Sequence, residues 1–153
     1  MMGAMEGLGP RNYGTCFRGL ACTVVTMMPY ERIRAWQKCH ELVLLVYQIT
    51  RGWPKEETYG LVAQSRRAAY SAAANIVEGS TKRGAREFRR FLDVSVGSLY
   101  ELSYILRLAR DLGLSSQEML EQLEATRESA GKLTWRLYES IKKKGLLAQA
   151  RPH

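Results

Sequence analysis

The sequence predicts an all-α protein that folds as an antiparallel, up-down four-helix bundle. Three observations predict this class. No proline lies between Lys55 and Arg151, so long helices are uninterrupted there. Apolar residues recur at alternating steps of four and three, the spacing of helices that pack side by side. The segments between these periodic stretches are short, which makes successive helices antiparallel neighbours.

The first helix is expected from about Glu31 to Arg51. Its main apolar stripe consists of Ala35, Cys39, Leu42, Val46, Ile49 and Trp53. A second stripe, formed by Trp36, Val43 and Tyr47, widens the apolar face beyond what one bundle core needs. We therefore expect these three side chains to lie between the subunits of a homo-oligomer.

The second helix is expected to start near Pro54, with Glu56 and Glu57 in its first turn, where the helix dipole favours carboxylates. Its second half is rich in alanine and serine, which allows a neighbouring helix to approach closely. We expect it to end at Gly79, because glycine readily adopts the left-handed conformation of a helix terminator.

The third helix is expected from about Ala85 to Leu112. The apolar stripe steps by four and three without a slip through Phe88, Leu92, Ser95, Leu99, Leu102, Leu106 and Ala109. The triplet Leu112-Gly113-Leu114 is typical of a Schellman terminator.

The fourth helix is expected to open with a capping box, because Ser115 and Glu118 stand three residues apart. Its stripe would run through Met119, Leu123, Thr126, Ala130, Leu133 and Leu137. We expect it to continue to about Lys144 and to end at Gly145.

The chain length of 153 residues suits one domain. We divide it into an N-terminal extension (1–28), disordered or preceding the true start of the protein, a bundle (29–146) and a flexible tail (147–153). The three cysteines form no metal or disulfide pattern, which favours the reducing cytoplasm, and no apolar run is long enough to cross a membrane.

The sequence contains no catalytic motif. His40 is flanked by Cys39 and Glu41, but adjacent residues do not face one another on a helix. Glu78 and Glu101 are carboxylates that could meet between helices, without a catalytic partner. We therefore expect no enzyme activity, no metal site and no cofactor.

A basic cluster surrounds the start of the third helix, and the net charge of +8 favours anionic partners. At about 100° per residue its members fall opposite Phe88 and Leu92, on the solvent side. Cations near a helix start oppose the dipole, so an anionic partner would explain them, whereas a helix C-terminus already explains Lys142, Lys143 and Lys144. The predicted nucleic-acid-binding residues are Lys82, Arg83, Arg86, Arg89 and Arg90.

Two short signatures point to a known family. One is the stretch from Ser71 to Gly79, with Asn75 and Glu78 at its end, and the other is Gly97-Ser98-Leu99-Tyr100-Glu101-Leu102. Together with Trp36-Gln37-Lys38 and Tyr59-Gly60-Leu61, they resemble the four-helix-bundle proteins encoded by intervening sequences within bacterial large-subunit rRNA genes. The signature residues, read as structural or at a subunit interface, are Asn75, Glu78, Gly79, Ser98 and Glu101.

The resemblance implies a homopentamer and a role associated with nucleic acid. A related branch serves as the accessory protein of diversity-generating retroelements, which binds a reverse transcriptase and its RNA. A protein-interaction scaffold without a nucleic-acid role stays open as a further alternative. For Asn75 and Glu78 we favour hydrogen bonds to a helix end or to a neighbouring arginine over a place on an RNA-facing rim.

Overall fold

The computed structural model describes residues 27–149, with side chains to Leu147. It consists of helices α1 (Arg34–Ile49), α2 (Leu61–Ser80), α3 (Ala85–Asp111) and α4 (Gln117–Gln149). Single 3-10 turns precede α1 at Pro29–Arg32 and connect it to α2 at Thr50–Gly52 and Lys55–Glu57. No strand occurs in these residues, and the prediction of an all-α four-helix bundle is confirmed.

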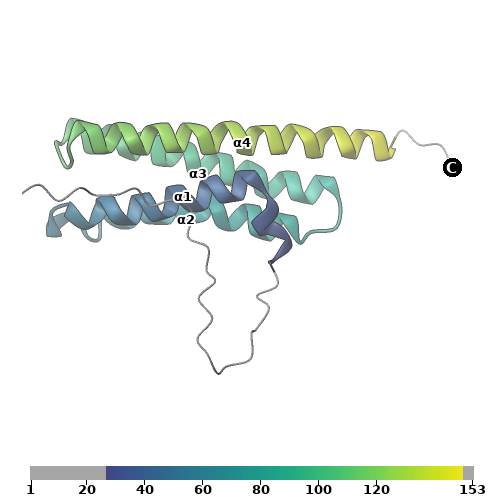
Figure 1. Ribbon diagram of the computed structural model, residues 1–153, viewed down its shortest axis with the longest axis horizontal. Helices are drawn as coiled ribbons and strands as arrows, with labels where there is room; N and C mark the ends of the chain where they lie inside the picture. Colours follow the sequence, from purple (N-terminus) through teal and green to yellow (C-terminus); the bar gives the residue numbers. More distant parts are fainter. Residues whose placement is uncertain (1–26, 150–153) are drawn as a thin grey trace, which may run out of the picture.

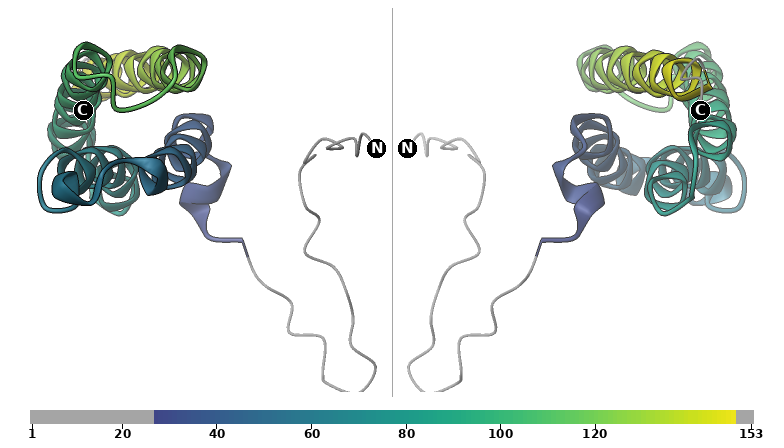
Figure 2. Two further views of the ribbon diagram at one scale, coloured as in Figure 1. Left: turned by 90° about the vertical axis from the view of Figure 1, so that its left-hand side faces the viewer. Right: turned by 90° about the vertical axis from the view of Figure 1, so that its right-hand side faces the viewer.

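The helices follow one another around the bundle, as the end-on views in Figure 2 show. Each helix packs against the next in the chain, and α4 also contacts α1, which closes the bundle. Figure 1 shows α4 lying along α3 and extending beyond the end of the other helices. The largest side chains in the centre are fully buried: Leu42, Ile76, Leu92, Leu99, Leu102, Leu120 and Leu123.

The predicted apolar stripes of the first and third helices are confirmed. Every member of the main α1 stripe, from Ala35 to Trp53, is buried. In α3 the stripe is buried from Leu92 to Ala109, and Phe88 is partly buried against the core. Steps of four and three therefore identify the inward face correctly wherever a helix has one dominant stripe.

The predicted stripe of the fourth helix is displaced at its start. Met119 is 48% exposed, whereas its neighbour Leu120 is buried. Thr134, which the prediction omitted, is also buried, and its hydroxyl donates to the Ala130 carbonyl at 2.8 Å. A threonine whose hydroxyl is hydrogen-bonded within its own helix can occupy a core position. A pattern of apolar residues alone therefore does not identify the whole inward face of α4.

Two glycines that were predicted to end helices lie inside them instead. α2 continues through Gly79 to Ser80, and α4 continues through Gly145 to Gln149. A Cβ at Gly79 would lie 2.6 Å from Phe88 Cδ2, and one at Gly145 would lie 2.9 Å from the Ala85 Cβ. Both glycines therefore allow their helix to approach α3 closely, whereas the prediction had them end a helix.

Gly113, in contrast, ends α3 as predicted. Its φ is +66°, its N–H donates to the Arg110 carbonyl at 3.1 Å, and the Leu114 N–H donates to the Ala109 carbonyl at 2.9 Å. These two bonds define a Schellman motif.

The starts of α2 and α4 differ from the prediction. α2 begins at Leu61 rather than near Pro54, and the Glu57 carboxylate accepts a hydrogen bond from the Leu61 N–H at 3.1 Å. At α4 the Ser116 hydroxyl, not Ser115, caps the helix by accepting from the Met119 N–H at 3.4 Å. The predicted capping box with Glu118 is therefore wrong by one residue.

The α1–α4 contact contains the one cysteine in the described part of the chain. Cys39 Sγ lies 3.8 Å from Thr134 Oγ1, and the side chain is fully buried. Burial raises the pKa of the Cys39 thiol to about 11, while the contact with Thr134 lowers it by less.

The predicted extension at 1–28 lies outside the described residues except for Met27 and Met28. The Met28 N–H donates to a Glu31 carboxylate oxygen at 2.7 Å. At the other end, residues 147–149 of the predicted tail belong to α4.

Candidate nucleic-acid interface

The five residues of the basic cluster lie together at one end of the bundle. Lys82 and Arg83 belong to the turn between α2 and α3, and Arg86, Arg89 and Arg90 belong to the first two turns of α3. The turn needs glycine at its end, because Gly84 has a φ of +102° that other residues rarely adopt. Gly84 also leaves α3 without a side-chain cap. Uncapped N–H groups add positive potential to the arginines that follow.

The members of the cluster differ in their partners. Lys82 forms an ion pair with Glu78 at 3.2 Å, and Arg90 forms one with Glu87 at 3.4 Å. Both cations also lie near the Phe91 ring, at 5.0 and 5.3 Å from its centroid. Exposed pairs of this kind contribute about 0.5 kcal/mol at most and exchange readily with solvent.

Arg83 and Arg86 are exposed, and neither takes part in an ion pair within residues 27–149. A guanidinium without a carboxylate partner keeps its full charge available to an anion. These two residues are therefore the best placed of the five to contact a phosphate.

Arg89 corrects the prediction that all five cations face solvent. Its side chain is only partly exposed, and its Nε atom is buried without a hydrogen-bond partner among the described residues. Arg89 precedes the buried Leu92 by three positions, so it stands at the edge of the core stripe, on the flank that faces α4. The helical pattern of α3 alone does not indicate which flank a neighbour covers.

A second group of cations lies at the same end. Gly145 of α4 approaches Ala85 of α3, so Lys142, Lys143 and Lys144 are level with the first turn of α3. α4 continues to Gln149, more than one turn beyond Lys142, and the dipole acts only within the last turn. The C-terminal explanation of these lysines is therefore weaker than predicted. We call the basic cluster together with Lys142–Lys144 the basic end.

The family signatures meet between α2 and α3. The hydroxyl oxygens of Ser71 and Ser98 lie 2.8 Å apart, and the Ser95 hydroxyl donates to the Ala72 carbonyl at 2.7 Å. Asn75 Nδ2 donates to the Ser71 carbonyl at 2.8 Å, within its own helix rather than to a helix end. The signature positions therefore build a polar seam between two helices that are otherwise packed through alanines.

Glu78 and Glu101 do not meet. The contacts of Ser71 with Ser98 and of Gly79 with Phe88 fix the register of α2 and α3. In this register roughly ten to twelve residues of α3 separate the two carboxylates, or about 15–18 Å at the helical rise of 1.5 Å per residue. Glu78 pairs with Lys82, and Glu101 is exposed.

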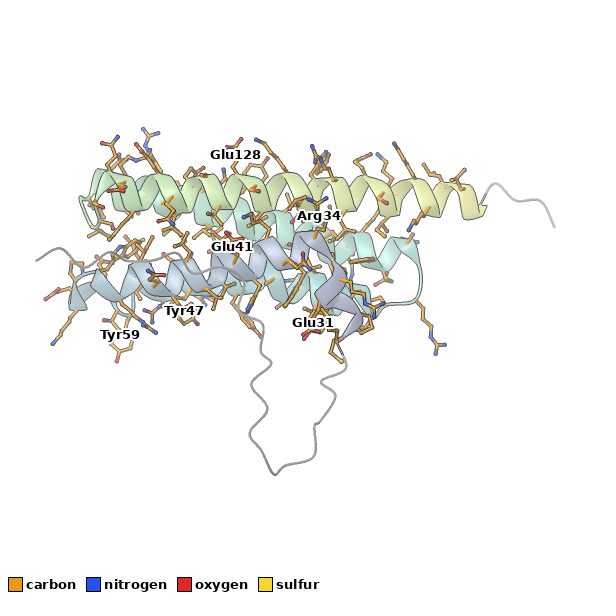
Figure 3. All side chains as sticks on the ribbon, viewed as in Figure 1. Glu31, Arg34, Glu41, Tyr47, Tyr59 and Glu128 are labelled. Carbon is orange, nitrogen blue, oxygen red and sulfur yellow. The ribbon has the colours of Figure 1, made fainter. Side chains whose placement is uncertain are left out.

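The predicted interface stripe on α1 is only partly free. Trp36 and Val43 pack in part against the core, and Trp36 also stacks on His40 with ring centroids 5.1 Å apart. Tyr47 is 41% exposed, and the Arg66 guanidinium covers one face of its ring at 4.8 Å. Figure 3 shows Tyr47 on the side of the bundle away from α4.

In the described residues, no group of three histidine, cysteine or acidic side chains is placed to hold a metal ion. Within residues 27–149, no helix combines the length and the apolar character needed to cross a bilayer.

The chain belongs to the family described as 23S rRNA-intervening sequence protein, whose family model matches residues 31–136. It is similar in structure to a protein of unknown function from the S23 ribosomal protein family of Bacteroides thetaiotaomicron VPI-5482. The two are 19% identical, the match covers 68% of this chain and 97% of that one, and the TM-score is 0.62, which shows a shared fold. No curated protein matches the chain. The family match indicates no catalytic class.

Proposed function

We propose that this protein is a non-catalytic, homo-oligomeric bundle that binds the phosphate backbone of nucleic acid through its basic end, without strong sequence specificity. One observation carries the proposal: Arg83 and Arg86 are exposed and without ion pairs in the described chain, beside a helix start that has no side-chain cap. Each cation there opposes the dipole by about 0.3–1 kcal/mol, and a bound phosphate would offset this cost.

The proximity of Lys142–Lys144 supports the same proposal, because it enlarges the cationic surface beyond one helix. The family name also supports it, since an intervening sequence within an rRNA gene is a setting rich in RNA. The basic end has no groove-reading motif, so backbone contacts are the expected mode of binding.

A salt titration of binding tests the proposal. With about five phosphate contacts, the logarithm of the binding constant for duplex DNA should fall with the logarithm of salt at a slope of about −4 to −5. Gel shifts on rRNA fragments and on random DNA measure this directly. If neither is retained near physiological salt, the protein is a protein-interaction scaffold instead.

Charge reversal locates the surface. Arg83, Arg86 and Arg90 changed to Glu should abolish binding while the fold and the assembly persist. The matched control changes Arg67, Arg107 and Arg110 to Glu, with the same change in net charge on exposed positions away from the basic end. Equal loss in both triple variants would show that total charge, rather than the basic end, controls binding.

Homo-oligomerisation is proposed on the remaining exposed apolar side chains. Leu44 and Tyr47 of α1 are 59% and 41% exposed, and on the opposite side Tyr100, Tyr104 and Trp135 are 71%, 68% and 54% exposed. We propose a homopentamer, by resemblance to the family. Light scattering coupled to size exclusion should give several times the subunit mass of 17.4 kDa, and a monomer would contradict the proposal.

A further inference from the structure

A polar hollow between α3 and α4 lies within the basic end. It has a volume of about 320 Å³ and opens to solvent. The side chains around it are those of Arg86, Glu87, Arg89, Arg90, Asp93 and Tyr138. Three guanidiniums and two carboxylates give it a net charge of +1, and Glu87 is already paired with Arg90.

Arg89 is the unusual member of this group. Its Nε is shielded from solvent and has no acceptor within the described residues, although water or a carboxylate normally satisfies such a donor. Asp93 lies one turn further along the same helix, yet no ion pair joins the two side chains. A buried donor without an acceptor is costly, and this cost would be removed if the Arg89 guanidinium turned its Nε–H toward an anion in the hollow.

α4 contributes an aromatic side chain to the hollow. Tyr138 stacks on Trp135 with ring centroids 5.3 Å apart and planes 8° apart, which favours one orientation of its ring. A hollow of this size accepts more than a bare ion, because small-molecule sites begin at about 300 Å³. The Asp93 carboxylate can accept a hydrogen bond from a hydroxyl that adjoins the anion.

We propose that this hollow is a seat for a single phosphate group carried by a hydroxyl-bearing sugar, with Arg89 and Arg86 binding the phosphate and Asp93 accepting from the sugar. The planar fork of an arginine suits phosphate better than the point charge of a lysine does. The seat deepens the proposed function, because a nucleic-acid strand would supply such a group, but a free sugar phosphate has the same chemistry.

The test observes the Arg89 Nε–H directly by NMR. Ribose 5-phosphate and inorganic phosphate are titrated at constant ionic strength, with sodium chloride as the reference. The resonance should shift saturably with both phosphates, more tightly with ribose 5-phosphate, and Arg89→Lys should weaken binding by about tenfold. Arg110→Lys is the matched control and should change binding by less than about twofold, because this exposed arginine lies at the other end of α3, outside the hollow, and makes no forked contact there.

The variant Asp93→Asn distinguishes a phosphate seat from an ion pair between Arg89 and Asp93. If Arg89 pairs with Asp93 in solution, the variant alone shifts the Nε–H resonance and phosphate does not, and the proposal is overturned. An absence of any saturable phosphate shift also overturns it.

The same variants, measured on a single-stranded RNA, distinguish the source of the phosphate and keep the two proposals apart. Arg89→Lys should weaken RNA binding severalfold more than Arg110→Lys does. If wild type binds RNA but not ribose 5-phosphate, and Arg89→Lys binds RNA as wild type does, the seat is wrong and the proposed function stands. If ribose 5-phosphate binds and RNA does not, the seat belongs to a free sugar phosphate and the proposed function is wrong.

Discussion

The two long seams of α3 are built in opposite ways. Towards α2 the packing is so close that a Cβ at Gly79 would lie 2.6 Å from Phe88, and serines bridge the helices. Towards α4 an open hollow of about 330 Å³ is lined by Tyr100 and Trp135. Gly131 lines this hollow, and neither Gly131 nor the exposed Gly97 of α3 has an atom within 4 Å of an added Cβ. Glu128 marks the outer edge of α4 beside this hollow (Figure 3).

The contrast shows that a helical glycine has two quite different explanations. A glycine inside a helix costs about 1 kcal/mol relative to alanine. At Gly79 the chain recovers this cost through close packing of α2 on α3. At Gly97 and Gly131 nothing in residues 27–149 does so, and these positions are consistent with the proposal that a second subunit packs on an outer face.

Among the changes that test this contrast, Gly79→Ala should have the largest effect on the free energy of unfolding. The added methyl must displace the Phe88 ring or separate α2 from α3, at a cost of about 1–3 kcal/mol in the free energy of unfolding. Urea denaturation followed by circular dichroism measures the loss. Wild-type stability in this variant would mean that the α2–α3 seam is looser than the structure indicates.

Ser98→Ala should have a smaller effect on the same seam. Its hydroxyl lies 2.8 Å from that of Ser71 and 2.9 Å from the Val94 carbonyl, and loss of these contacts should cost about 1 kcal/mol. Ser140→Ala is the control, because Ser140 is exposed and should change stability by less than about 0.5 kcal/mol. Equal effects of the two changes would show that the Ser98 hydroxyl does not stabilise the packing of α2 on α3.

Gly97→Ala should have the smallest effect on stability, and the opposite sign. The position is exposed and open, so alanine should stabilise the subunit by about 0.5–1 kcal/mol. If another subunit packs on this face, the same change should also reduce the mass seen by light scattering. A gain in stability with unchanged assembly would place the subunit interface elsewhere, with the α1 side chains Leu44 and Tyr47 as the next candidates.

The sequence was sufficient for the fold and for the inward faces of α1 and α3, because these depend on local periodicity. It was insufficient at Gly79 and Gly145, where a local signal for chain termination conceals a close contact with Phe88 or Ala85. A glycine that ends a helix, such as Gly113, differs from these two packing glycines in its positive φ and in the lack of a close neighbour. A short window of sequence contains neither property. The inward face of α4 was incomplete for a related reason, since the buried position of Thr134 depends on its contact with Cys39 of the distant helix α1.

The basic cluster was recognisable from its composition, but its internal differences were not. The inward position of Arg89 depends on which flank of α3 is covered by α4. The nearness of Lys142 to the start of α3 depends on the antiparallel register of two helices separated by a turn. Counting residues back from the Gly113 turn would have indicated that register, and it is the one signal for the basic end that the sequence offered and the prediction did not use.

The burial of Cys39 makes its thiol an internal probe of how often the bundle opens. A thiol reacts as its thiolate, and a pKa of about 11 leaves only about one molecule in a thousand ionised at pH 8. A reagent can therefore modify Cys39 rapidly only in those moments when α1 has left α4 and the thiol has regained its ordinary acidity. With Cys16 and Cys22 replaced by serine, the rate at which Cys39 is modified would report how often the contact between α1 and α4 opens.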